Sequence, residues 1–178
     1  MNKWDGKSGY IIPEDVALIQ KLARMLPNRH VNVVDLGAGS GTTALSVFSI
    51  RDAGIALTSI DVVPQALENT RLNMVQYGYI TMWNSLKLRS DVAGKQWTAG
   101  LVDMLMCDAT HDYASQQDEL NAWERHLQPG TLVWIHEYAG YANGMYPGVK
   151  AAVDEFIAAG KLETIEVSGL SWGGKYIG

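Results

Sequence analysis

The sequence has 178 residues, of which 47% are hydrophobic and 19% charged, a composition typical of one globular domain. A net charge of −5 without any cluster of lysine and arginine argues against a nucleic-acid backbone as the main ligand. The sequence contains no apolar run long enough to span a membrane and no signal peptide, and its single cysteine, Cys107, excludes an internal disulfide. We therefore expect a single domain over residues 1–178 that works in the reducing cytoplasm, with neither a nucleic-acid nor a membrane partner.

Predicted helices and strands alternate along the chain. Pro13 suits the first turn of one helix, and Pro64 opens another that ends near Gly78. The spacing of apolar residues predicts helices over residues 13–26, 42–50, 64–78, 115–127 and 149–157. The predicted strands cover residues 31–36, 56–61, 81–90, 101–108 and 131–138. Polar residues within 81–90 leave the bounds of that strand open.

Two further strand-like segments, 162–167 and 170–177, follow one another with no helix between them. Strands joined without a crossover helix pair in antiparallel fashion, so we expect a hairpin at one edge of the sheet. The alternation before them predicts a mostly parallel sheet covered by helices on both faces. The expected fold class is therefore α/β, a three-layer sandwich around a seven-stranded, mostly parallel sheet with an antiparallel edge strand.

A glycine-rich loop, Gly-Ala-Gly-Ser-Gly at 37–41, follows the first predicted strand. Ligands of such sheets bind beyond the carboxyl ends of the strands, and a loop with few side chains lets a ligand approach its backbone closely. A nicotinamide dinucleotide would require G-x-G-x-x-G, but Gly41 comes one position early and Thr42 stands where Gly or Ala is wanted. Asp35, two positions before the first glycine, suits a cationic ligand better than a pyrophosphate.

S-adenosylmethionine fits this pattern because its ammonium and sulfonium groups favour a nearby carboxylate such as that of Asp35. Asp61 ends the second predicted strand and is placed to accept hydrogen bonds from both ribose hydroxyls. Nicotinamide sites also use an acid at a similar spacing, so Asp61 does not discriminate between the two cofactors. The glycine spacing and Asp35 together favour S-adenosylmethionine.

At this point the sequence resembles a known family. The stretches "VVDLGAGSGTTAL", "SIDVVPQALENTRLN" and "VDMLMCDATHDY" stand in the order and spacing of the class I S-adenosylmethionine-dependent methyltransferases. The later stretches "CDATHDY", "LQPGTLVWIHEY" and "PGVKAAVDEF" are similar to the small-molecule group called methyltransferase domain 24, in which strands end in motifs such as D-G-D-H-S-Y and H-D-Y. The resemblance covers roughly residues 9–160. It implies a Rossmann-like fold and methyl transfer from S-adenosylmethionine to a small molecule, with oxygen the expected acceptor atom.

The resemblance also implies a set of cofactor-binding residues. Those expected around the methionine part of the cofactor are Asp35, Gly37, Ala38, Gly39 and Ser40. Asp61 would hold the ribose, Val62 would lie against the adenine, and Asp108 at the end of the fourth strand would complete the set. Ser90 and Asp91 are the expected adenine contacts at the end of the third strand, with 83–85 as an alternative register.

The candidate catalytic residues follow the fourth and fifth predicted strands. Methyl transfer is an in-line displacement, and a hydroxyl acceptor must also lose its proton. Thr110 stands where relatives have the second acid of a D-x-D pattern, so that potential base is missing here. His111 or His136 could serve instead, since an imidazole titrates near neutrality, and Asp108 is the third catalytic candidate.

A divalent metal is a further hypothesis. Metal-dependent relatives bind magnesium through a carboxylate after the fourth strand and two acids after the fifth. Asp108 and Glu137 stand at matching positions, but His136 replaces an acid. This exchange weakens the case for magnesium, while zinc or manganese on Asp108, His136 and Glu137 stays open.

The acceptor side and the reaction type each allow more than one interpretation. Trp4, Tyr10 and the tyrosine-rich loop 138–148 could form a lid over the acceptor or could be ordinary surface segments, and a second copy of the chain could complete the site. A nicotinamide oxidoreductase is disfavoured because a Tyr-x-x-x-Lys proton relay is absent. A lyase or aminopropyl transferase would use the same cofactor with a different acceptor side. Because Thr110 and His136 stand where relatives have acids, a non-catalytic cofactor-binding module is a further alternative.

Overall fold

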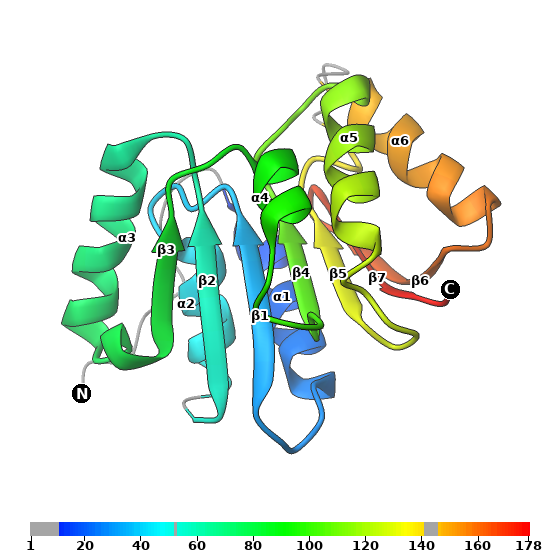
Figure 1. Cartoon of the computed structure of the whole chain (residues 1–178). Helices are drawn as coiled ribbons and strands as arrows, with labels where there is room; N and C mark the ends of the chain where they lie inside the picture. Colours follow the sequence, from blue (N-terminus) through cyan, green and yellow to red (C-terminus); the bar gives the residue numbers. More distant parts are fainter. Residues whose placement is uncertain (1–10, 52, 141–145) are drawn as a thin grey trace.

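The computed structural model describes residues 11–51, 53–140 and 146–178, which form a sheet with helices on both faces (Figure 1). The strands are β1 (Val31–Leu36), β2 (Ile55–Ile60), β3 (Trp83–Leu86), β4 (Met104–Cys107), β5 (Leu132–Ile135), β6 (Leu162–Ser168) and β7 (Ser171–Tyr176). The helices are α1 (Pro13–Met25), α2 (Thr42–Phe48), α3 (Pro64–Tyr77), the short 3-10 helix η1 (Ile80–Met82), α4 (Ser90–Gln96), α5 (Tyr113–Glu124) and α6 (Pro147–Ala158). No described helix is both long and apolar enough to cross a membrane.

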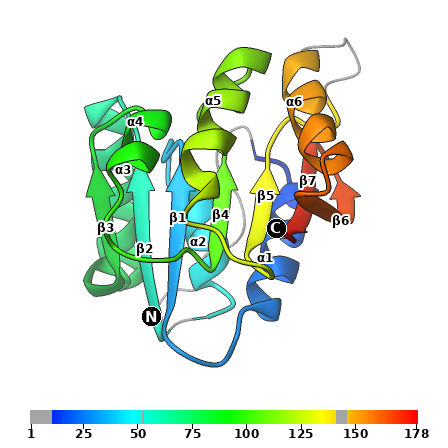
Figure 2. The ribbon, with the colours of Figure 1, turned by 45° about the vertical axis from the view of Figure 1, so that its right-hand side comes forward.

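The seven strands have the order β3-β2-β1-β4-β5-β7-β6. The first five strands in this order are parallel, as expected of strands that are connected along the chain through helices. Strand β7 runs antiparallel to both of its neighbours, β5 and β6, and the β6–β7 hairpin forms one edge of the sheet (Figure 2). The predicted fold class, including the antiparallel hairpin at the edge, is confirmed.

Two apolar cores lie on opposite faces of the sheet because side chains alternate along each strand. In β1, Val31 and Val33 pack with the layer of α1, α2 and α3, whereas Val34 and Leu36 pack with the layer of α4, α5 and α6. The tryptophans expected in the core, Trp83, Trp123 and Trp134, are buried, while Trp97 is only half-buried and packs against Trp123. The sheet is thus a rigid support for the loops at its ends.

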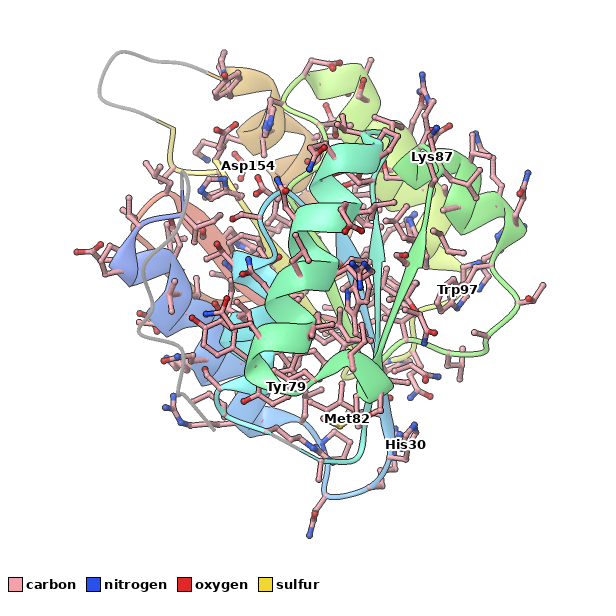
Figure 3. The ribbon with its side chains drawn as sticks, turned by 90° about the vertical axis from the view of Figure 1, so that its left-hand side faces the viewer. His30, Tyr79, Met82, Lys87, Trp97 and Asp154 are labelled. Atoms are coloured by element: carbon pink, nitrogen blue, oxygen red, sulfur yellow. The ribbon has the colours of Figure 1, made fainter. Side chains whose placement is uncertain are left out.

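The parallel strands place all of their carboxyl ends at one end of the molecule. Lys87, just after β3, lies at that end, and His30, just before β1, lies at the opposite end (Figure 3). His126, the other histidine expected to be structural, contacts the backbone oxygen of Gly94 through Nε2 at 2.7 Å. The loops after β1, β2, β4 and β5 therefore lie together at the carboxyl end of the sheet, where the sequence predicted the ligand site.

The third predicted strand lies within the stretch 81–90, as the sequence indicated, but it is shorter than that stretch. A strand was expected over 81–90, but β3 covers only Trp83–Leu86, and Ser90 begins the unpredicted helix α4. The seven residues of α4 include Gly94, and this glycine lies so close to α5 that a Cβ atom would come within 3.0 Å of Ala122. Packing against α5 therefore stabilises a helix whose sequence has little helical periodicity.

Candidate active site

The glycine loop lies directly against the turn that follows β4. Gly37 has a φ of 88°, and a Cβ atom on it would come within 2.3 Å of the backbone oxygen of Asp108. Only glycine meets both requirements, because a side chain would be strained by the left-handed backbone and would clash with the neighbouring chain. The loop therefore brings its own backbone and Asp108 to one place at the carboxyl end of the sheet.

Two pockets lie on either side of this contact. The larger, of about 330 Å³, is lined by Gly37, Gly39, Ile60, Asp61, Val62, Leu88, Arg89, Ser90, Asp91, Asp108, Ala109, Thr110 and Ser115. The smaller, of about 280 Å³, is lined by Ile11, Gly37, Ala38, Gly39, Ser40, Thr42, Thr43 and Asp108. Gly37, Gly39 and Asp108 line both pockets, so the pockets meet at these three residues.

Every residue expected to bind the cofactor lines one of these pockets except Asp35. The Asp35 side chain is completely buried, and its two oxygens accept hydrogen bonds from Thr43 Oγ1 at 2.7 Å and Ser59 Oγ at 2.8 Å. Trp83 Nε1 in turn donates to Ser59 Oγ at 2.9 Å. Burial raises the pKa of Asp35 to about 7, although these hydrogen bonds oppose the shift. In this structure Asp35 supports the loop from beneath and lines neither pocket, so its expected place beside the cofactor stays a prediction.

Asp61 occupies the place after β2 that the sequence suggested. Its Oδ1 accepts a hydrogen bond from the backbone N–H of Val63 at 2.8 Å, and its Oδ2 accepts one from Gly39 at 3.3 Å. The carboxylate is thereby oriented in the wall of the larger pocket. Val62 beside it is 53% exposed, which leaves an apolar side chain open to a ligand in this pocket.

Ser90 and Asp91 line the larger pocket from the first turn of α4, and not from the end of a strand. The alternative register, 83–85, lies within β3 itself. Arg89 Nε donates to Asp91 Oδ1 at 3.0 Å, and Lys95 Nζ donates to Oδ2 at 3.1 Å. Burial acts to raise the pKa of Asp91, but these two cations outweigh it and lower the pKa, so the carboxylate is ionised and already paired.

His136 lies between two carboxylates just after β5. Its Nδ1 is 2.9 Å from Asp108 Oδ1, and its Nε2 is 3.3 Å from Asp15 Oδ2 without the alignment of a hydrogen bond. The ring is almost fully buried and stacks on Trp134. Burial acts to lower the pKa of His136, but Asp108 and Asp15 outweigh it and raise the pKa to about 10. Both ring nitrogens of His136 thus face carboxylates inside the protein, an arrangement that does not favour its predicted role as a base.

His111 has a different environment. Its Nδ1 lies 2.5 Å from Glu137 Oε2, and its side chain remains 38% exposed. Glu137 has a φ of 60°, and burial raises its pKa although His111 and His136 oppose the shift. The His111 ring also packs at 4.9 Å from the ring of Tyr146, at the start of α6. Of the two histidine candidates, only His111 combines an orienting carboxylate with an exposed side chain.

The predicted metal ligands do not form a metal site in this structure. Asp108, His136 and Glu137 do lie near one another, but both nitrogens of His136 face carboxylates and Glu137 pairs with His111. Within the described ranges, no three His, Cys, Asp or Glu side chains are arranged to hold a metal ion. Since both nitrogens of His136 face carboxylate oxygens and Glu137 lies against His111, the side chains as arranged do not fit the metal hypothesis.

Several residues of the larger pocket were missed by sequence reasoning: Leu88, Arg89 and Ser115 carried no recognisable signal. Thr110 was noticed only as a departure from D-x-D, yet its hydroxyl is buried at the pocket wall with no hydrogen-bond partner among the described residues. Asp112 caps α5 by accepting from Ser115 N at 3.0 Å. Of the proposed lid, Trp4, Tyr10 and residues 141–145 lie outside the described residues.

The family model Methyltransf_24, described as a methyltransferase domain, matches residues 34–138. The chain belongs to this family. The match includes the loop after β1 and the turns after β4 and β5, and with the fold it confirms a class I S-adenosylmethionine-dependent methyltransferase. No curated protein sequence matches the chain.

Solved structures of methyltransferases share the fold at low sequence identity. A Bacillus cereus O-methyltransferase, solved with S-adenosylhomocysteine, has a TM-score of 0.72 at 11% identity and covers 98% of this chain and 84% of its own. The O-methyltransferase TomG from Streptomyces achromogenes, solved with S-adenosylmethionine, has a TM-score of 0.73 at 10% identity, with 92% and 79% covered. A Clostridium thermocellum protein provisionally assigned as an rRNA methylase has a TM-score of 0.72 at 16% identity, with 93% and 99% covered.

Proposed function

We propose that this methyltransferase moves the methyl group of S-adenosylmethionine to an oxygen atom of a small-molecule acceptor. The observation that carries the proposal is the pair of pockets that meet at Gly37, Gly39 and Asp108. One pocket offers a carboxylate and an apolar side chain at Asp61 and Val62, and the other is bounded by the glycine loop. A ligand with two unlike halves and a cationic centre matches this arrangement.

The adenosine half would lie in the larger pocket. Each oxygen of Asp61 accepts one backbone hydrogen bond, which leaves each able to accept one more from a ribose hydroxyl. Val62 would contact one face of the adenine, and Ser90 and Asp91 in α4 would border its edge. The residues present thus fit the cofactor without rearrangement of Asp61.

The methionine half would lie in the smaller pocket beside Ala38 and Ser40. The sulfonium would then lie where the two pockets meet, next to the carboxylate of Asp108. A carboxylate at this place favours a sulfonium over its neutral thioether product, because only the former carries the positive charge. Asp35 would act indirectly, by supporting the loop from below.

The bound cofactor supplies an activated methyl group, and the protein holds the acceptor in line with it. His111 would be the general base, since Glu137 lies against Nδ1 and orients the ring so that Nε2 accepts the hydroxyl proton. The methyl group moves from sulfur to oxygen, and S-adenosylhomocysteine leaves. We propose no metal for this step, because Asp108 lies against His136 and Glu137 lies against His111.

The net charge of −5 favours a small acceptor over a polynucleotide, whose phosphates a protein usually neutralises with lysine and arginine. We also propose a cytoplasmic location, since the sequence has a single cysteine that is buried. A second copy of the chain could complete the acceptor side of the site. A lyase or an aminopropyl transferase gains no support from the comparisons.

Calorimetric titration with S-adenosylmethionine tests the proposal. Asp61→Ala is expected to weaken binding about 30-fold or more, because two hydrogen bonds to a charged carboxylate are lost. Asp103→Asn is the matched control, since Asp103 pairs with Arg29 at the opposite end of the sheet. Failure of the folded wild-type protein to bind S-adenosylmethionine would contradict the proposal, as would equal affinities of the wild-type and Asp61→Ala proteins.

A further inference from the structure

Three charged side chains form a buried chain that ends at the junction of the two pockets. Asp15 in α1 is completely buried, His136 is 3% exposed, and Asp108 reaches the pockets. The distances are 3.3 Å from Asp15 Oδ2 to His136 Nε2 and 2.9 Å from His136 Nδ1 to Asp108 Oδ1. The buried His136 ring therefore connects a carboxylate remote from the pockets with a carboxylate that lines both of them.

Asp15 is held rigidly in its place. Its Oδ1 accepts hydrogen bonds from Leu170 N at 2.9 Å and from Ser171 Oγ at 2.7 Å, and its Oδ2 accepts one from Ile12 N at 3.1 Å. Its surroundings are close-packed, since a Cβ atom on Gly169 would come within 2.7 Å of Oδ1. Asp15 thus joins the start of α1 to the β6–β7 turn and presents a fixed negative charge to His136.

The position of Asp108 depends on this chain of contacts. A buried ring nitrogen without a polar partner is costly, and Asp15 and Asp108 face the two nitrogens of His136 from opposite elements, so together they hold the ring in its buried position. His136 in turn contacts one oxygen of Asp108 and limits how that carboxylate can rotate. If Asp15 lost its charge, His136 would be held from one side only, and Asp108 would be less well fixed at the pocket junction.

We propose that Asp15 is a positioning residue for methyl transfer, which acts through the buried His136 to hold the Asp108 carboxylate where the sulfonium crosses between the pockets. The inference rests on the proposed function, because it assumes S-adenosylmethionine in these pockets. It assigns a role to a residue that touches neither pocket and lies 93 positions from Asp108 in the sequence. It also gives His136 a role that differs from that of a base or a metal ligand.

A double-mutant cycle on S-adenosylmethionine binding tests this role. Asp15→Asn keeps the size of the side chain and removes its charge, and it is expected to raise the dissociation constant about tenfold. In a His136→Gln background, which lacks the connecting ring, the same substitution is expected to change the dissociation constant less than about twofold. Asp108→Asn supplies a second background for the same cycle if the His136→Gln protein does not fold.

The controls separate positioning from general damage. Asp103→Asn removes another nearly buried carboxylate, far from the pockets, and is expected to leave the affinity unchanged. An equal effect of Asp15→Asn in both backgrounds, or no effect in the wild type, would overturn the inference. An equal effect of Asp103→Asn would also overturn it, because the loss would then reflect stability alone. Absence of binding by the folded wild type would instead reject the proposed function, and the inference with it.

Discussion

The loop after β1 and the turn after β5 both use left-handed backbone, but only the first is built from glycine. Gly37 has a φ of 88° in the loop, whereas Glu137 has a φ of 60° in the turn. A left-handed conformation costs a non-glycine residue about 1–2 kcal/mol, and glycine adopts it freely. The loop therefore uses the residue that suits its backbone, whereas the turn has a strained glutamate whose side chain contacts His111.

The largest expected effect comes from a substitution in the loop after β1. Gly37→Ala should lower the free energy of unfolding by at least about 3 kcal/mol and abolish cofactor binding, because the added Cβ meets the Asp108 backbone as well as a strained φ. Gly100→Ala is the matched control, since Gly100 has a similar φ of 92° with no atom within 4 Å of the added Cβ. Denaturant unfolding of both variants measures the difference, and equal losses would refute the role of the close approach.

The second prediction concerns the carboxylate beneath that loop. Burial raises the pKa of Asp35 to about 7, so Asp35 favours folding while it is protonated, below the unfolded value of 3.8. This contribution is lost as the pH rises towards 7, because the buried group must then ionise. Asp35→Asn should therefore gain more than about 1 kcal/mol of stability, relative to the wild type, between pH 4 and pH 8.

Unfolding by denaturant at a series of pH values would measure this difference. Asp15→Asn is the opposite case, because the pKa of Asp15 is lowered, and its substitution should cost more stability at pH 7 than at pH 3. Burial acts to raise the pKa of Asp15, but His136 and Ser171 outweigh it. A difference between the wild type and Asp35→Asn that does not vary with pH would show that Asp35 is ionised throughout.

The smallest expected effect comes from substitutions of Glu137 in the turn after β5. Glu137→Gly and Glu137→Ala both remove the partner of His111, but only the glycine variant relieves the left-handed backbone. The glycine variant should therefore be more stable than the alanine variant by about 1 kcal/mol, the reverse of the usual order. Thermal or denaturant unfolding would measure this, and a more stable alanine variant would argue against strain at Glu137.

Most of the cofactor side of the site could be predicted from the sequence. Glycine spacing after a run of valines indicates a loop at the end of a strand, and Asp61 follows the next strand. The exception is Asp35, whose carboxylate faces the α2 side because side chains alternate along β1. Its partners Thr43 and Ser59 lie in α2 and β2, and no pattern in the sequence indicated that they would satisfy both oxygens.

The acceptor side was much less predictable. His111 and His136 stood in similar polar motifs, and the sequence offered no ground for expecting one to be exposed and the other buried between two carboxylates. Helix α4 was missed because its stability comes from packing against α5 and not from its own periodicity. For the same reason, Ser90 and Asp91 were expected at the end of the third strand but belong to that helix.

The sequence by itself determined the alternation of strands and helices, the hairpin at the edge, the loop that approaches a ligand and the acid after β2. These features depend on local periodicity and on the backbone freedom of glycine, which are properties of neighbouring residues. Only the tertiary structure decided which charges meet. It buried His136 between two carboxylates and left His111 exposed, because Asp15 and Asp108 converge on one ring from distant parts of the chain. The pKa of a buried group depends on such nearest partners, which no local pattern indicates.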